Sequence, residues 1–319
     1  MDAYSQAQTK TSSAKTFTWL IRRELWEHRA FWIVPAVVMG IILLTHVVAL
    51  FKGSQHLNIA GDMLPTIDGL NKSMVPVFGE VVMLALVAIF GVATGIVSVF
   101  YLLDSLYSER RDRSVLFWKS LPITDTATVG SKLFTGVVVL PLVALVAAFV
   151  TYVCILLLLT LAFGFREGFP LFGLWNPLSM LSSISKWLVL TLTQQVWFLP
   201  LYAWLLFCSA FARKAPFLVA VLVPLGITLA ENLAYRHSYL SDIIGGYFVG
   251  FFTVVEENSP HVGGGIDFST GENSMSAETI SIVDILQVFT QGQLYVGLAV
   301  AAILIFATIW WRRNHVELG

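Results

Sequence analysis

The sequence predicts an all-α integral membrane protein, a single domain made of a six-transmembrane-helix bundle. The first observation is composition: 57% of the 319 residues are hydrophobic and 12% are charged, whereas ordinary soluble domains carry about 25% charged residues. The second observation is that six uncharged apolar runs recur along the chain. Most of them approach or exceed the roughly 20 residues that a helix needs to cross a bilayer.

The predicted spans cover residues 31–50, 81–103, 133–163, 187–212, 215–235 and 294–311. Inside a bilayer every backbone polar group needs a partner within the protein, and an α-helix supplies these partners within one segment. The runs do not alternate polar and apolar residues, so the strands of a membrane barrel are excluded.

Lysine and arginine are distributed unequally between the two predicted sides of the membrane. Of the 19 basic residues, 14 fall in the terminal segments and in the loops 104–132 and 213–214. Because loops rich in Lys and Arg stay in the cytoplasm, we expect both termini to be cytoplasmic. We expect a multi-pass protein of a bacterial cytoplasmic (inner) membrane, with 236–293 as the largest outside loop.

Two segments outside the spans are also apolar. Residues 16–30 predict an N-terminal amphipathic helix in the cytoplasmic interface, because Trp19 and Trp26 are residues that favour that depth. The alternative is a simple extension of the first span into the cytosol. In the outside loop, the uncharged run 243–255 is too short to span and is typical of a re-entrant or interfacial segment.

No catalytic motif is present. The sequence contains no P-loop, no zinc-protease motif and no nucleophile elbow, so we predict no catalytic residue, cofactor or metal. Cys154 and Cys208 lie in apolar runs and predict buried thiols. Glu80 and Glu231 lie near span ends, where we expect interfacial solvation rather than a role in transport.

Gly91 and Gly95 form a small-xxx-small pair in the second span, a pattern suited to close helix packing. Such a pair occurs often by chance in apolar sequence, so it is a weak indication of helix packing. It is the one helix-packing motif that we single out.

The segment 104–132 is the most informative part of the chain. A charged cluster with Glu109, Arg110 and Arg113 precedes a short apolar helix, which Pro122 ends. Thr124 or Asp125 is suited to cap the next helix. Composition leaves two interpretations: a loop that only sets topology, or a surface that another protein covers. The apolar helix contributes Val115, Phe117, Trp118 and Leu121.

Residues 109–133 resemble the permeases of type-2 ABC transporters. The resemblance consists of a Glu-Arg pair, a small residue, an apolar helix, a Pro-Ile-Thr turn and a Gly-x-Lys that enters the third span. These elements are Glu109-Arg110, Ser114, residues 115–121, Pro122-Ile123-Thr124 and Gly130-Ser131-Lys132. Arg113 departs from the pattern, because a glycine is usual there. The six-span layout, the amphipathic N-terminal helix and the re-entrant segment match as well.

The resemblance implies that 104–132 is a coupling loop that docks on a separate ABC-type ATPase subunit. Glu109, Arg110 and Arg113 would then contact that subunit or brace the loop, and Val115, Phe117, Trp118, Leu121 and Pro122 would form the covered helix. A second permease copy or a paralogue would complete the transporter. No nucleic acid is an expected partner, and the lipid bilayer is.

We therefore predict the permease subunit of an ATP-driven exporter, with hydrolysis on another chain. The alternative is a stand-alone secondary transporter, which the absence of midplane carboxylates disfavours. An intramembrane hydrolase lacks any paired nucleophile or metal motif, and an ABC importer lacks its loop signature. The sequence does not specify the substrate.

Overall fold

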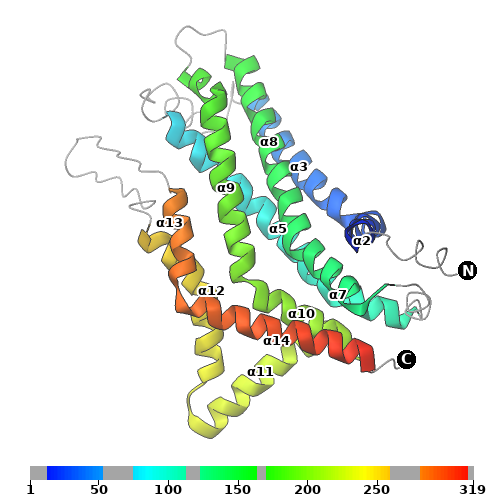
Figure 1. Ribbon diagram of the computed structural model, residues 1–319. Coiled ribbons are helices and arrows are strands. Elements are labelled where there is room, and N and C mark those ends of the chain that lie inside the picture. The colour runs from blue at the N-terminus through cyan, green and yellow to red at the C-terminus, as the bar shows by residue number, and fades with distance from the viewer. Residues whose placement is uncertain (1–12, 53–74, 113–122, 164–169, 259–280, 315–319) are drawn as a thin grey trace, which may run out of the picture.

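Helices form the whole regular structure of the computed structural model, which describes residues 13–52, 75–112, 123–163, 170–258 and 281–314 (Figure 1). No strand occurs among these residues, as the sequence predicts. Five helices are long and apolar enough to cross a membrane, and a bent pair makes a sixth crossing if it counts as one span. This is the helix content of a multi-pass membrane protein.

The N-terminal half contains α2 (Ser13–Glu27), α3 (Ala30–Lys52), α5 (Val75–Arg111), α7 (Asp125–Phe134), the π-helical turn η1 (Thr135–Val139) and α8 (Leu140–Phe163). The C-terminal half contains η2 (Pro170–Trp175), α9 (Pro177–Trp197), α10 (Leu199–Phe211), α11 (Pro216–Tyr235), α12 (Tyr239–Asn258), α13 (Ile282–Leu286), η3 (Gln287–Thr290) and α14 (Gly292–Asn314). The first, fifth and sixth predicted spans correspond to α3, α11 and α14.

The second and third spans extend further than their apolar runs. Helix α5 continues beyond residue 103 to Arg111, and α7, η1 and α8 follow one another without a break from Asp125 to Phe163. Arg110 and Arg111 lie in the last turn of α5, where positive charge stabilises the negative end of the helix dipole. The predicted loop 104–132 is therefore helical at both of its ends.

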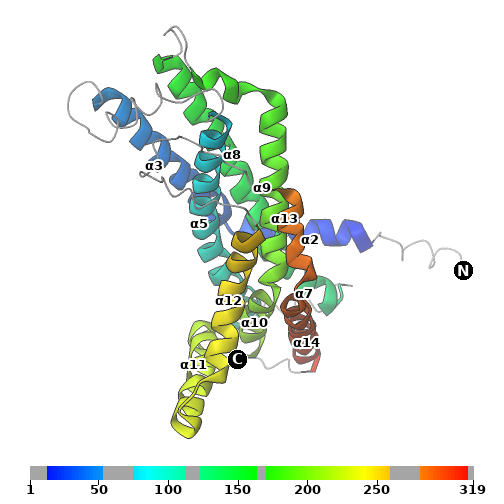
Figure 2. The same cartoon turned by 90° about the vertical axis from the view of Figure 1, so that its left-hand side faces the viewer.

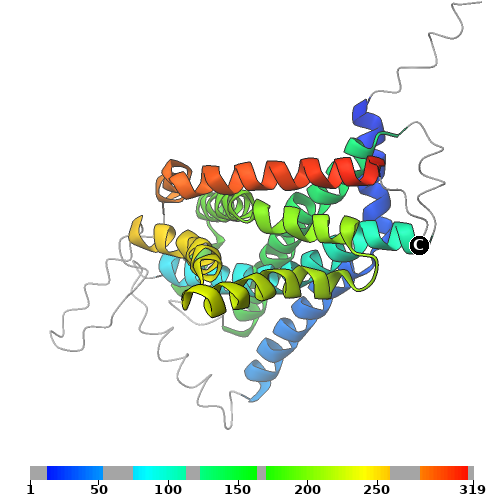
Figure 3. The same ribbon diagram turned by 90° about the horizontal axis from the view of Figure 1, so that it is seen from below.

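The fourth predicted span, 187–212, is divided into two helices. α9 and α10 meet at Phe198 with a bend of 52°. Pro200 explains the break, because proline lacks an N–H donor and its ring clashes with the carbonyl four residues earlier. Beyond the bend, α10 runs side by side with α14 (Figures 1 and 3).

Helix α12 packs against this bend. The Trp197 indole N–H donates to the Tyr247 carbonyl at 2.9 Å, and the Tyr247 hydroxyl donates to the Trp197 carbonyl at 2.5 Å. Phe198 and Phe251 add a buried aromatic contact. The run that predicts a short re-entrant or interfacial segment is thus one part of a 20-residue helix.

Both ends of the described chain lie at one end of the bundle (Figure 1). Figure 1 looks almost along α2, and Figure 2 shows α2 lengthwise, running across the direction of α3. If α9 and α10 count as one bent span, the described residues contain six candidate crossings.

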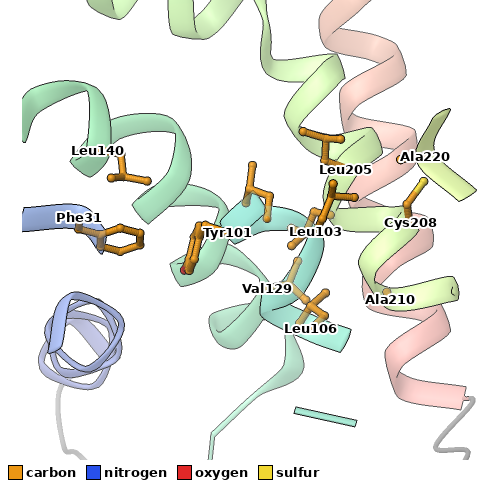
Figure 4. Packing of buried hydrophobic residues seen from close by; sticks show 12 residues of the cluster. Phe31, Tyr101, Leu103, Leu106, Val129, Leu140, Leu205, Cys208, Ala210 and Ala220 are labelled. Carbon is orange, nitrogen blue, oxygen red and sulfur yellow. The ribbon is translucent and has the colours of Figure 1, made fainter. Parts of the chain in front are cut away.

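A hydrophobic core fills the bundle near the end that carries the termini (Figure 4). Phe31 from α3 packs edge-on against Tyr101 from α5, with ring centroids 5.1 Å apart. Leu140 from α8 and Leu206 from α10 are fully buried in the same cluster. Tyr101 also contacts Glu24 through its hydroxyl, so this core packs directly against charged residues at the same end of the bundle.

Candidate functional site

Six charged side chains meet where α2, α5, α7 and α14 converge. We refer to them as the ionic cluster, which consists of Arg23, Glu24, Glu109, Asp125, Lys132 and Arg312. Three carboxylates face three cations, so the cluster is formally neutral. The helices that supply these residues come from the beginning, the middle and the end of the described chain.

Lys132 is the centre of the ionic cluster. Its ammonium nitrogen lies 3.0 Å from Glu24 Oε1 and 3.2 Å from Glu109 Oε1. The three side chains are only 2%, 1% and 5% exposed. Charges are expensive to remove from water unless they are paired and hydrogen-bonded. The pairing therefore holds α2, α5 and α7 in one arrangement.

Arg312 extends the cluster to the last helix. Its guanidinium donates to Glu109 Oε2 at 2.8 Å and to Asp125 Oδ1 at 2.9 Å. Glu109 is near the end of α5 and Asp125 is the first residue of α7. One arginine of α14 thus bridges the two helices that flank residues 113–122.

Glu24 is held by neutral groups as well as by charges. The Tyr101 hydroxyl donates to Glu24 Oε2 at 3.0 Å. Burial by itself raises the pKa of the Glu24 carboxyl, but a hydrogen bond with His28 and the charges of Lys132 and Arg23 lower this pKa to about 2. The carboxyl is therefore ionised at any physiological pH.

Arg110 fixes the end of α5 to the end of α10. Its guanidinium donates to the carbonyls of Ser209 at 2.6 Å and Ala212 at 2.8 Å. The last carbonyls of a helix have no donor within that helix, so an arginine satisfies them well. The Ser209 hydroxyl in turn accepts from the backbone N–H of Leu106 at 3.0 Å.

The start of α7 is fixed by its cap. The Thr124 side chain accepts from the Ala127 backbone N–H at 3.2 Å, which confirms the predicted N-cap. Asp125 places negative charge in the first turn, where the helix dipole favours it. Both helices that border residues 113–122 are therefore anchored by several polar contacts.

The sequence-predicted site is described only in part. Glu109 and Arg110 lie at the end of α5, and the structure joins Glu109 to Lys132 from the same motif. The remaining predicted residues lie outside the described part of the chain. They are Arg113, Val115, Phe117, Trp118, Leu121 and Pro122.

Sequence reasoning missed Glu24 and Arg312 as members of the site. A signal for Glu24 existed: it lies on the same face of the N-terminal helix as Leu20, which is buried. A carboxylate on the buried face of an amphipathic helix needs a counter-charge. For Arg312, the position in the last turn of α14 gave no such signal.

Among the described residues, a methyl group built on Gly91 or Gly95 meets no atom within 4 Å beyond its chain neighbours and the helix's own backbone, and Gly91 is exposed. Packing of this face against another helix stays a prediction. Both cysteines, Cys154 and Cys208, are free thiols.

A small cavity of about 150 Å³ lies at the other end of the bundle. Glu80, Tyr152 and Ser183 are among the residues that line it, and Glu80 pairs with Lys186. Glu231 accepts a hydrogen bond from the Leu240 backbone N–H at 2.9 Å, which caps the start of α12. Both carboxylates therefore have protein partners.

Glu24, Glu27 and His28 lie close enough together to share a cation. Lys132 already occupies the position facing Glu24, and Arg23 bonds to Glu27 at 3.1 Å. Protein cations therefore already fill the role that a metal ion would take. This group of side chains is a structural ion-pair network.

Comparisons with protein-family models, with curated proteins and with solved structures found no match to this chain. The resemblance at residues 109–133 therefore stays a prediction. The fold defines the chain as a multi-pass helical membrane protein.

Proposed function

We propose that the chain is the permease subunit of an ATP-driven transporter of the ABC type, an exporter, and that ATP is hydrolysed on a separate subunit. The segment 113–122 docks on that ATPase, and a second permease copy or a paralogue completes the assembly. The termini and this segment face the cytoplasm of a bacterial inner membrane, with α2 at the interface.

One observation carries the proposal: both helices that border residues 113–122 are anchored to the rest of the bundle. Glu109 and Asp125 share Arg312, and Lys132 connects Glu109 to Glu24. A force applied to the segment therefore acts on α2, α5, α7 and α14 together. A loop that only sets topology does not need such anchoring.

The absence of a nucleotide-binding motif supports the assignment of ATP hydrolysis to a separate subunit. An exporter permease needs a mechanical input rather than a nucleotide site, and the sequence contains no P-loop. Bracing by buried ion pairs suits this role, since paired charges resist separation in a low-dielectric environment. Glu109 and Arg110 act as braces, and the apolar residues 115–121 make the contact with the ATPase.

Co-purification tests the proposal. The chain is co-expressed with the ABC-type ATPase encoded beside its gene, extracted in detergent and isolated through a tag on the permease. We expect the ATPase to co-purify with the wild-type chain and to be lost with Trp118→Asp. Lys214→Glu, in the exposed turn between α10 and α11, is the control and keeps the ATPase. Equal recovery with Trp118→Asp contradicts the docking role.

A stand-alone secondary transporter is the alternative, and the Glu80–Lys186 pair beside a cavity is the observation that favours it. Carriers couple ion movement to transport through charged side chains along their path, and this pair lies beside a cavity at one end of the bundle. This alternative predicts gradient-driven transport by the purified chain in vesicles without ATP or partner. It also predicts that Glu80→Gln abolishes this transport.

A further inference from the structure

The face of α2 that points away from the ionic cluster alternates cationic and aromatic side chains. Lys15, Trp19, Arg22 and Trp26 follow one another at intervals of four, three and four residues. With about 100° per residue, these four lie within about 60° of one another around the helix axis, and Glu24 lies on the opposite side. All four are exposed.

Arg22 lies between the two tryptophans. Its guanidinium carbon is 5.2 Å from the centre of the Trp19 ring and 4.7 Å from that of Trp26. The cation–π contacts restrain the arginine side chain. A guanidinium presents several N–H donors in a planar fork that matches the oxygens of a phosphate group.

The two tryptophans are too exposed for a helix that faces only water. Trp19 is 63% exposed and Trp26 is 69% exposed. Indole rings favour the boundary between lipid and water, where the ring is apolar and the N–H is wet. An interfacial position suits α2, because it runs across α3 and α3 begins at Ala30, three residues after α2 ends.

The charge on this face has one sign. Lys15 and Arg22 are joined by Arg29, which is exposed just beyond the end of the helix. Of the acidic residues of α2, Glu24 is buried and Glu27 is bonded to Arg23. A face of cations and indoles is complementary to a surface that offers phosphate groups above acyl chains.

We propose that this face of α2, which comprises Lys15, Trp19, Arg22 and Trp26, together with Arg29 just beyond the helix, binds the headgroups of anionic phospholipids in the leaflet on the side of the termini. The tryptophans enter the boundary region and the cations contact the phosphates. Because the opposite face carries Glu24, one helix connects this lipid surface to the ionic cluster. The proposal is independent of any ATPase partner.

Native mass spectrometry of the full chain tests the proposal. The purified protein is mixed with equal amounts of phosphatidylglycerol and phosphatidylcholine with identical acyl chains, and the retained lipids are counted. We expect wild-type protein to retain phosphatidylglycerol in preference. In the triple variant Lys15→Gln/Arg22→Gln/Arg29→Gln the preference falls by about fivefold or more, since each cation near a membrane surface contributes roughly that factor.

The matched control removes three exposed cations elsewhere at the same end: Arg111→Gln/Lys214→Gln/Arg313→Gln. We expect this variant to keep most of the preference. No preference in wild type, or an equal loss in both triple variants, overturns the proposal.

A second measurement needs no change of charge. Vesicles that contain brominated phosphatidylglycerol or brominated phosphatidylcholine quench tryptophans that touch the labelled lipid. We expect stronger quenching by the anionic lipid in wild type, and a smaller difference in Trp19→Phe/Trp26→Phe. Equal quenching of wild type by the two lipids contradicts a preference for anionic headgroups.

Discussion

Lys132 lies between two carboxylates with almost none of its side chain exposed, 3.0 Å from Glu24 and 3.2 Å from Glu109. Removing this one cation leaves two buried carboxylates close together. Removing a carboxylate as well relieves part of that repulsion. At the scale of residues, the free energy of the ionic cluster therefore depends on balanced charge rather than on any single pair.

We predict that Lys132→Met destabilises the protein by on the order of 3–5 kcal/mol, because it breaks a buried pair from one side. The double variant Lys132→Met/Glu24→Gln is expected to be more stable than Lys132→Met alone. Thermal unfolding in detergent measures both. Arg111→Gln is the control, since the Arg111–Asp112 pair is exposed and water screens the attraction between its charges. Equal melting of Lys132→Met and Arg111→Gln contradicts the account.

Acid provides an independent test of the same cluster. The pKa of Glu24 falls from its ordinary value of 4.5 to about 2 in the folded protein, so the unfolded chain binds the proton more readily. The resulting stabilisation, on the order of 3 kcal/mol, is fully present above pH 4.5 and is lost as the pH falls from there towards 2. Glu24→Gln lacks this dependence.

The measurement is the melting temperature of wild type and of Glu24→Gln between pH 7 and pH 2. We expect the difference between the two proteins to shrink below pH 4.5. If the difference in melting temperature stays constant down to pH 2, the partners of Glu24 do not lower its pKa, which contradicts the account.

At this scale the sequence predicts some members of the cluster and misses others. Glu109 and Lys132 both belong to the motif that carries the resemblance, but the resemblance assigns no contact between them. Glu24 meets Lys132 across 108 positions and Arg312 meets Glu109 across 203 positions. Pairs this distant depend on how the helices pack, which no local pattern contains.

At the scale of elements, the packing of α12 and α14 beside the bend between α9 and α10 depends on a close approach at Gly297. A methyl group built on Gly297 overlaps the Tyr247 hydroxyl oxygen and lies 2.8 Å from Cζ of the same ring. Glycine therefore allows α14 to approach the tyrosine that bonds to Trp197. The tyrosine ring must move if any side chain is added there.

We predict that Gly297→Ala destabilises the protein, because Tyr247 loses its hydrogen bond to Trp197 and the aromatic packing at the bend is disturbed. Unfolding in detergent checks this, and a loss of about 1–3 kcal/mol is expected. Gly91→Ala is the matched control on α5. The methyl group meets no neighbour there in the described part of the chain, and alanine favours the helix by up to about 1 kcal/mol.

Two results would contradict this element-level account. The first is a Gly297→Ala variant as stable as wild type. The second is a marked loss of stability in monomeric Gly91→Ala. If Gly91→Ala lowers only the fraction of dimer, the predicted packing role of the Gly91–Gly95 pair gains support.

The apolar runs predict where the helices lie, because membrane spans are defined by composition over about 20 residues. They do not predict where helices bend or end. Pro200 indicates a bend within 187–212. Because the residues around it form one uncharged apolar run, the sequence predicts a single span there. The end of α5 at Arg111 depends on contacts of Glu109 and Arg110 with other helices, which apolar composition does not contain.

At the scale of the whole molecule, the ionic cluster joins the first helix to the last. Glu24 belongs to α2 and Arg312 belongs to α14, and both are connected to Glu109 and Lys132. Glu109 and Asp125, which Arg312 joins, lie on the two helices that precede and follow residues 113–122. The arrangement suits transmission of movement between that segment and the spans, which is the central claim of the proposed function.

The most direct test of this claim is a photo-crosslink from position 118. The chain carries p-benzoyl-phenylalanine in place of Trp118, is co-expressed with the neighbouring ATPase and is illuminated in membranes. The same crosslinker in place of Phe100, an exposed residue within α5, is the control. The account predicts a permease–ATPase adduct from position 118 and none from position 100. No adduct from position 118 while the ATPase is present at equal level, or equal adducts from both positions, contradicts the coupling role.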